Sequence, residues 1–231
     1  MHARLSTLGL ATAALLAFAG CGLVDGEKST TTEAYDVEGD IKTIDLKGQA
    51  GAVELVAAEG GIRVTERREY SSTAPKTSHR SEGGTLYLVD KGCDTQLRIR
   101  RACETTYRIE APAGVAVKIQ VDAAPVTITG ITGPLDVTTD VGAIKGTGLG
   151  GATRIRTDVG DVDLRYGAAP ASLDATNDVG STTVYLPSAA TYRFEVKVDV
   201  GDTTIDLPSR PDADHRIKLT ADVGDITVRA A

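Results

Sequence analysis

The chain of 231 residues is long enough for one sizeable domain or two small ones. Its formal net charge of -7 argues against a nucleic-acid-binding protein, because such proteins usually carry a basic face. Hydrophobic residues make up 41% of the chain, whereas aromatic residues make up only 4% and Trp is absent. We therefore expect a folded protein whose core consists mainly of Val, Ile, Leu, Ala and Thr.

The first twenty residues have the layout of a secretory signal peptide. Arg4 provides a short positive start, and residues 5–18 form an apolar stretch without a charge. The following sequence, Phe18-Ala19-Gly20-Cys21, resembles the lipobox of bacterial lipoproteins, in which the Cys becomes the lipidated N-terminus. This resemblance implies that residues 1–20 are removed and that Cys21 anchors the protein to the extracytoplasmic face of the cell membrane. The alternative is an ordinary signal peptide that is cut nearby and leaves Cys21 free.

The next segment, residues 21–33, is small, polar and without periodicity, and we expect a flexible tether there. Two further cysteines, Cys93 and Cys103, have nine residues between them. An exported protein folds in a compartment that permits disulfides, so this pair is predicted to form one. The alternative is a pair of reduced thiols.

Residues 34–231 consist of short segments in which apolar and polar residues alternate, and no sustained helical period occurs. Period-two alternation predicts strands with one buried and one exposed face. Residues 34–120 are less regular, and we expect irregular rungs there with a mobile polar loop over residues 71–84.

The second part, residues 121–231, contains five segments that share the tripeptide Asp-Val-Gly. Their spacing of about 20 residues is typical of a solenoid. We therefore predict an all-β, single-domain parallel β-helix with coils of about 20 residues, each made of two or three short strands, of undetermined handedness. The alternative is an antiparallel sandwich of hairpins, which would need no register among these corners.

Stacked coils would place equivalent residues about 4.8 Å apart. The corner valines are then expected inside, namely Val141, Val159, Val179, Val200 and Val223. The preceding carboxylates are expected to stack along one edge: Asp140, Asp158, Asp178, Asp199 and Asp222. A second, partial row would contain Asp161, Asp202 and Asp225.

Such carboxylates can accept hydrogen bonds from backbone amides at the corners, or they can hold calcium through several oxygen ligands. The calcium-binding nonapeptide G-G-x-G-x-D is absent, which favours the structural interpretation.

The phrase YRIEAPAGVAVKIQV precedes corners of the type T-D-V-G-D-V. In this order of features, residues 38–231 resemble the bacterial "putative adhesin" family of β-strand-repeat proteins, whose function is unknown. The resemblance implies a β-solenoid on the bacterial cell envelope and transfers no catalytic residue.

No catalytic motif accompanies these strands. The sequence has no G-x-S-x-G, P-loop or G-x-G-x-x-G, and nothing pairs a Ser or Thr with a His that could act as a base. His79 and His215 are expected in separate loops, which argues against a zinc site. A polysaccharide-active enzyme is the catalytic alternative, but the coils are too short to build the cleft that such enzymes use.

We therefore expect a non-catalytic binding or adhesion-like module without a resident cofactor, with calcium as the alternative stated above. The expected partners are the membrane, through the lipid anchor, and an envelope protein or glycan. The competing hypothesis is a structural or sensory envelope protein that associates with itself or with a membrane partner. The final segment, ADVGDITVRAA, shows no evident cap, and an uncapped edge favours pairing with another strand.

Overall fold

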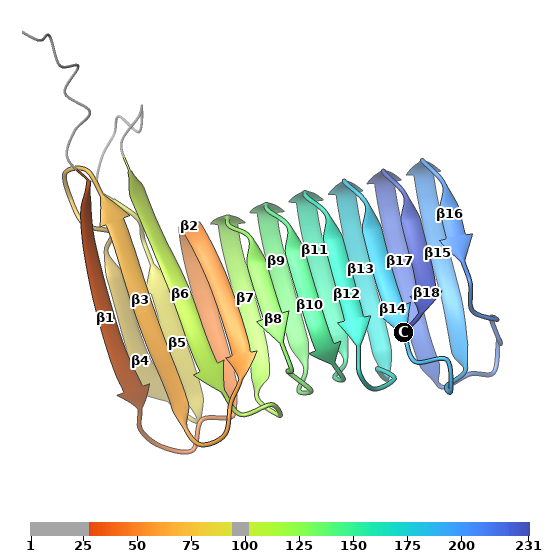
Figure 1. Cartoon of the computed structure of the whole chain (residues 1–231), viewed down its shortest axis with the longest axis horizontal. Coiled ribbons are helices and arrows are strands. Elements are labelled where there is room, and N and C mark those ends of the chain that lie inside the picture. The colour runs from red at the N-terminus through yellow and green to blue at the C-terminus, as the bar shows by residue number, and fades with distance from the viewer. Residues whose placement is uncertain (1–27, 94–101) are drawn as a thin grey trace, which may run out of the picture.

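The computed structural model describes residues 28–93 and 102–231, and these residues form an all-β protein of two large, mostly parallel sheets (Figure 1). Sheet A contains, in spatial order, β1 (Ser29–Val37), β3 (Ile62–Tyr70), β6 (Cys103–Ala111), the second half of β2 (Thr43–Ala57), β8 (Val126–Thr129), β10 (Ile144–Leu149), β12 (Val162–Tyr166), β14 (Thr182–Leu186), β18 (Ile226–Ala230) and β16 (Thr203–Ile205). Sheet B contains β4 (Thr77–Glu82), β5 (Thr85–Asp90), the first half of β2, β7 (Ala116–Ala123), β9 (Leu135–Val141), β11 (Thr153–Val159), β13 (Ser172–Val179), β17 (His215–Val223) and β15 (Tyr192–Val200).

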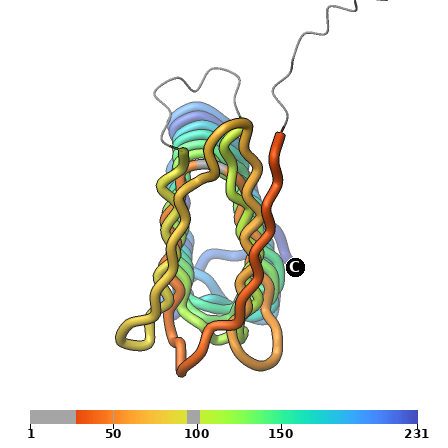
Figure 2. Tube along the Cα trace, turned by 90° about the vertical axis from the view of Figure 1, so that its left-hand side faces the viewer, coloured from red at the N-terminus to blue at the C-terminus, as the bar shows by residue number. Residues whose placement is uncertain are grey.

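The two sheets face each other along the whole molecule, and the chain crosses between them at two rows of corners (Figure 2). From β7 onward each strand in sheet B is followed by a strand in sheet A, so every turn of the chain contributes two strands. Inward-facing residues of both sheets form one hydrophobic cluster that extends from Ile44 to Val228. Within the described ranges no helix occurs, and therefore none that could cross a membrane.

The N-terminal region departs from the parallel pattern. β1 pairs antiparallel with β3, β3 pairs antiparallel with β6, and β4 pairs antiparallel with β5. The predicted tether over residues 21–33 was therefore wrong at its C-terminal end, because Ser29 to Glu33 pair with Tyr70 to Glu66 of β3. Residues 21–27 of that tether, Cys21 among them, and the signal peptide lie outside the described residues.

The polar segment over residues 71–84 was predicted to be a mobile loop, but six of its residues, Thr77–Glu82, form β4. Gly83 and Gly84 both have positive φ, and they join Glu82 to Thr85 in a two-residue hairpin turn. Such turns require positive φ at both central residues, which glycine adopts without steric cost. The tight hairpin pairs this polar segment with β5, and the sequence of the strand itself has no apolar alternation that would reveal it.

The C-terminal end of the fold also differs from the prediction. β17 lies between β13 and β15, and β18 lies between β14 and β16. The last segment of the chain is therefore covered on both sides, and the outermost strands are β15 and β16 (Figure 1). The expectation of an open edge at ADVGDITVRAA was wrong, because the chain folds back by one coil before it ends.

Candidate functional site

The five Asp-Val-Gly segments form one row of corners at the junction between the two sheets. Parallel pairing aligns Val141 with Val159, Val159 with Val179, and Val179 with Val223, and Val200 pairs with Val223 at the end. We refer to this row of corners as the Asp-Val-Gly edge. The common register required by the parallel prediction is thus present.

Glycine is required at these corners by close backbone packing. At Gly160, Gly180 and Gly224 a Cβ atom would lie only 2.1–2.2 Å from the carbonyl oxygen of the glycine in the adjacent corner. Gly180 and Gly224 also have φ of +139° and +141°, a conformation that side chains with a Cβ rarely adopt. The glycines therefore let neighbouring corners stack at the spacing of the strands.

The valines of this edge point to solvent, which corrects the prediction that they are inside. Their exposed fractions are 53% for Val141, 46% for Val159, 47% for Val179, 62% for Val200 and 47% for Val223, and they are the exposed large hydrophobic side chains of the described chain. The inward position is taken instead by the residue before the Asp, as in Thr139, Thr157 and Asn177, which are almost completely buried.

The alternation of inward- and outward-facing side chains ends at the Asp, because the peptide group that follows the Asp already belongs to the corner. The carbonyl groups of Val159 and Val179 accept hydrogen bonds from the amides of Gly142 and Gly160, both at 2.9 Å. These bonds turn the valine backbone toward the neighbouring corner, and the valine side chain projects outward. The glycine directly after each valine was the sequence signal that could have revealed this break in alternation.

The carboxylates occupy two different environments. Asp140, Asp158, Asp178, Asp199 and Asp222 are all exposed beside the valines. In the second row, Asp161 accepts the amide of Ser181 and Asp225 accepts the amide of Asp202, each at 2.9 Å. The structural interpretation is thus confirmed for Asp161 and Asp225.

The described part of the chain contains no cluster of three or more His, Cys, Asp or Glu residues that could hold a metal ion. The five stacked aspartates therefore do not converge on one point, although they share one edge. Strand pairing spaces them evenly and directs them outward, so each carboxylate is presented to solvent or to a partner. In this arrangement they supply a line of negative charge along the edge.

A depression of about 420 Å³ lies beside the first corner. Asp122 and Asp140 line it together with Lys47, Gln120 and Thr138 from the outer face of sheet B. Because it shares Asp140 with the Asp-Val-Gly edge, the depression extends that edge with groups that can accept and donate hydrogen bonds.

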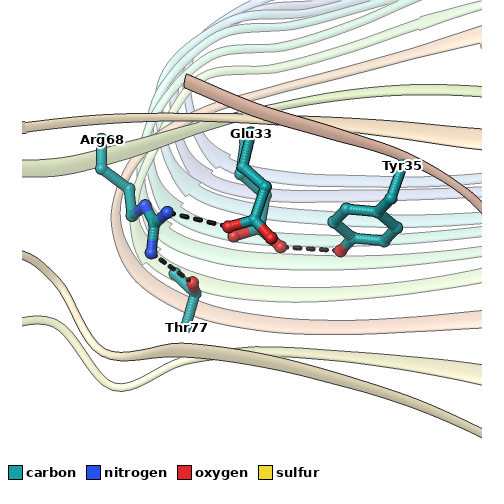
Figure 3. Close-up of polar contacts among 5 residues, drawn as sticks. Glu33, Tyr35, Arg68 and Thr77 are labelled. Carbon is teal, nitrogen blue, oxygen red and sulfur yellow. Dashed lines mark hydrogen bonds and ion pairs between the residues drawn. The ribbon is translucent and has the colours of Figure 1, made fainter. Parts of the chain in front are cut away.

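The opposite end of the molecule is closed by a polar cluster (Figure 3). The hydroxyl of Tyr35 donates to the buried carboxylate of Glu66 at 2.7 Å, and Arg68 pairs with Glu33 at 2.9 Å. Arg68 also donates to the hydroxyl of Thr77, 3.4 Å away on β4. Burial and the bond to Glu66 raise the pKa of Tyr35 far above its usual range, so its hydroxyl remains a donor.

His79 lies in β4 and not in a loop, and its ring stacks on Tyr35 with 4.0 Å between centroids. This contact joins the edge strand of sheet A to the edge strand of sheet B. His215, at the start of β17, contacts the carbonyl of Pro170 at 2.8 Å. The two histidines therefore hold structural positions far from each other.

Cys93 and Cys103 form the predicted disulfide, with 6.1 Å between their Cα atoms. It joins the segment after β5 of sheet B to the first residue of β6 in sheet A. Near it, Asp90 is buried and accepts the amide of Gly92 at 2.7 Å. Burial raises the pKa of the Asp90 carboxyl above its ordinary value.

A comparison with protein-family models found no match, and a search of curated proteins found no relative. Among solved structures, the chain is similar to a protein of Clostridium sporogenes that is named a putative cell adhesion protein. The two share 14% identity with a TM-score of 0.52, over 88% of this chain and 100% of the other. A protein of Bacteroides fragilis named a putative adhesin shares 15% identity with a TM-score of 0.46, over 89% of this chain and 99% of the other. The first of these likenesses supports the all-β fold, and the adhesion names belong to those proteins.

Proposed function

We propose that this protein is a lipid-anchored, extracytoplasmic β-solenoid that acts as a non-catalytic binding module of the bacterial cell envelope. The solenoid description rests on the parallel pairing of neighbouring coils from β7 to β18. The anchor rests on the lipobox-like sequence that ends at Cys21. A binding role is supported by the adhesion-type name of the structural neighbour and by the surface described next.

One observation carries the binding role, namely the row of exposed valines flanked by aspartates. Contiguous exposed apolar side chains with a polar rim are typical of interaction surfaces. Strand pairing spaces the valines by about 4.8 Å, so five of them form a straight apolar strip of roughly 20 Å. The corner glycines hold this strip on a rigid backbone, which reduces the ordering that binding would require.

The chemistry of the strip favours a protein partner with apolar groups and basic residues. The valines bury apolar area, and the adjacent exposed aspartates complement Lys and Arg on the partner. A glycan is less well matched, because sugar sites usually include aromatic rings and none belongs to this edge. The depression at Asp122 and Asp140 offers a place where a basic side chain can be held.

Crosslinking in the native envelope tests this function. The lipidated protein is captured from intact cells, and a Val159→Ser, Val179→Ser variant is compared with it. Both valines are exposed, so the variant is expected to fold with a free energy of unfolding within about 0.5 kcal/mol of the wild type. We expect loss of a specific crosslinked partner from the variant and its retention by the control Arg156→Ser, which changes an exposed residue on the outer face of β11. Equal capture by all three proteins would contradict a binding role for this edge.

The anchor is tested separately. The wild-type protein should fractionate with membranes and carry a mass consistent with a lipidated Cys21, whereas Cys21→Ala should not. A wild-type protein that is released in soluble form with an unmodified Cys21 would contradict the anchor and leave the binding surface to be judged by the crosslinking experiment.

A further inference from the structure

The strands β15 and β16 form the outer end of both sheets. β15 pairs with β17 on one side, and β16 pairs with β18 on one side. The inward-facing residues of this last coil are only partly buried, and they pack against the core from its end: Phe194, Val196, Val198 and Ile205. An edge strand with apolar residues facing an open core is a template for pairing with another chain.

Part of the β15 edge is already covered by the chain itself. The amide of Arg210 donates to the carbonyl of Tyr192 at 2.8 Å, and the amide of Phe194 donates to the Ser209 hydroxyl at 3.3 Å. Because backbone groups alternate in direction along a strand, the same side of β15 is then reached by the amide and carbonyl of Val196 and Val198. The open part of the edge therefore lies in the second half of the strand.

The charges on the outer face of β15 alternate in sign. They are Arg193, Glu195, Lys197 and Asp199, and all lie on the face opposite Val196 and Val198. Lys197 contacts Asp199 at 2.9 Å, and the side chains of both are more than half exposed. Such an alternation is self-complementary, since a strand of this pattern that runs antiparallel to itself can bring opposite charges face to face.

We propose that a second copy of this chain pairs its β15 with this edge, antiparallel and about a two-fold axis at Val198. This register places Lys197 opposite Asp199 of the second copy, and Asp199 opposite its Lys197. It places Val196 opposite Val200, whose carbonyl already accepts the amide of Gly224 on the β17 side, so the backbone pairing is centred on Val198, and it leaves the segment over Tyr192 and Phe194 undisturbed. A pair centred on Lys197 would bring two lysines together and is disfavoured by like charge.

The result is an end-to-end dimer in which the sheets continue from one copy to the next. A two-fold contact of this kind is closed, because each β15 edge is used once. The opposite end of the molecule is not equivalent, since the Tyr35–His79 stack joins its two edge strands, β1 and β4, and the Arg68–Thr77 hydrogen bond joins β3 to β4. Charge complementarity therefore favours a closed pair over a head-to-tail filament.

Cysteine crosslinking in intact cells tests the register. Residues that face each other as a hydrogen-bonded antiparallel pair have Cα atoms about 5.5 Å apart, which is within the range of disulfides. With a mild oxidant, Val198→Cys is therefore expected to give a covalent dimer on a non-reducing gel. Val196→Cys is the matched control, because it faces Val200 and not itself. A dimer from Val196→Cys alone, or from neither variant, would overturn the proposed register.

A charge exchange tests the pairing itself. The protein is extracted in mild detergent, and its mass is measured by sedimentation across a concentration series. Lys197→Glu is expected to weaken dimerisation at least tenfold, and the exchange Lys197→Asp, Asp199→Lys is expected to restore it. Lys145→Glu on the outer face of β10 makes the same change of charge away from the edge and should leave dimerisation intact. A wild-type protein that stays monomeric, or that forms filaments, would overturn the proposal.

Discussion

The N-terminal region from β1 to β6 and the parallel region from β7 to β18 hold their two facing sheets together in different ways. The N-terminal region combines antiparallel pairs, a disulfide and buried charged or hydroxyl groups, among them Glu66, Asp90 and Tyr107. The buried polar groups of the parallel region are uncharged, namely Thr and Asn side chains and the hydroxyls of Tyr166 and Tyr192, and this region relies on stacked glycine corners.

The comparison shows that two kinds of interaction can align the strands of this protein. In the parallel region the repeated backbone register aligns them, whereas in the N-terminal region contacts between particular side chains do so. Where coils follow at regular spacing, one corner geometry is enough to align all strands, and each side chain repeats the role of its neighbour. Where the chain reverses direction, as in β3 and β4, particular side-chain contacts must join the sheets. The Arg68–Thr77 hydrogen bond and the Tyr35–His79 stack are such contacts, and the Tyr35–Glu66 and Arg68–Glu33 contacts hold β1 on β3 within sheet A.

The largest effect is expected at a corner glycine of the parallel region. In Gly180→Ala the new Cβ would lie 2.2 Å from the carbonyl oxygen of Gly160, and the alanine would have to adopt φ of +139°. We expect the free energy of unfolding to fall by about 3 kcal/mol or more, measured by urea denaturation. Gly114→Ala is the control, since a Cβ at that residue would have no heavy atom within 4 Å and its φ is ordinary. Equal stability of the two variants would show that the corners tolerate a Cβ.

The disulfide is expected to matter chiefly to the N-terminal region. Cys93→Ser combined with Cys103→Ser should lower the free energy of unfolding by about 2–3 kcal/mol, because the unfolded chain gains freedom. Hydrogen exchange should accelerate in β5 and β6 more than in β11 to β14. Uniform acceleration along the chain would instead show that the two regions unfold as one unit.

The polar cluster offers a smaller test of the same contrast. Tyr35→Phe keeps the ring on His79 but removes the donor to the buried Glu66 carboxylate. We expect a loss of about 1–2 kcal/mol in the free energy of unfolding, because a buried acceptor is left with one partner fewer. Tyr185→Phe in the parallel region, where Arg165 covers the ring at 3.9 Å on the outer surface, should change stability much less. A similar loss in both variants would contradict a special role for the Tyr35 hydroxyl.

The smallest effect concerns Asp90 and depends on pH. Because burial raises the pKa of Asp90, its ionised form is disfavoured in the folded state, and stability is lost as the pH rises through that pKa. Asp90→Asn removes this ionisation while its side-chain oxygen can still accept the Gly92 amide. We expect the variant to be the more stable protein at neutral pH, with the difference shrinking on acidification. Denaturation over a pH series measures it, and a variant that is less stable at neutral pH would contradict the sign.

Several features followed from local sequence patterns. The alternation of Ile155 and Thr157 with Arg154 and Arg156 placed the first pair inside and the second pair outside, as the structure confirms. The regular spacing of Asp-Val-Gly indicated parallel strands in common register, which the pairing of β9, β11 and β13 confirms. The disulfide between Cys93 and Cys103 was likewise correctly predicted.

Other features could not be read from spacing. The valines before the corner glycines fit an apolar interior by residue type, but the backbone bonds of the corner turn them outward. Similarly, Thr77–Glu82 has no apolar alternation, and only its pairing with β5 makes it a strand. In both cases the contacts that determine the structure join residues from different strands. The residue types within one segment specify these contacts only in part.

The sequence by itself determined the strand content, the corner spacing and the choice of small aliphatic core residues, because period-two alternation and glycine conformation are local properties. Only the tertiary structure decided the order of the last two coils and hence which strand lies at the open end. Coils of similar length and similar Asp-Val-Gly corners can pair in either order, so the order depends on side-chain packing between whole coils. That packing buries β17 and β18 between their neighbours and leaves β15, with its alternating charges, at the edge.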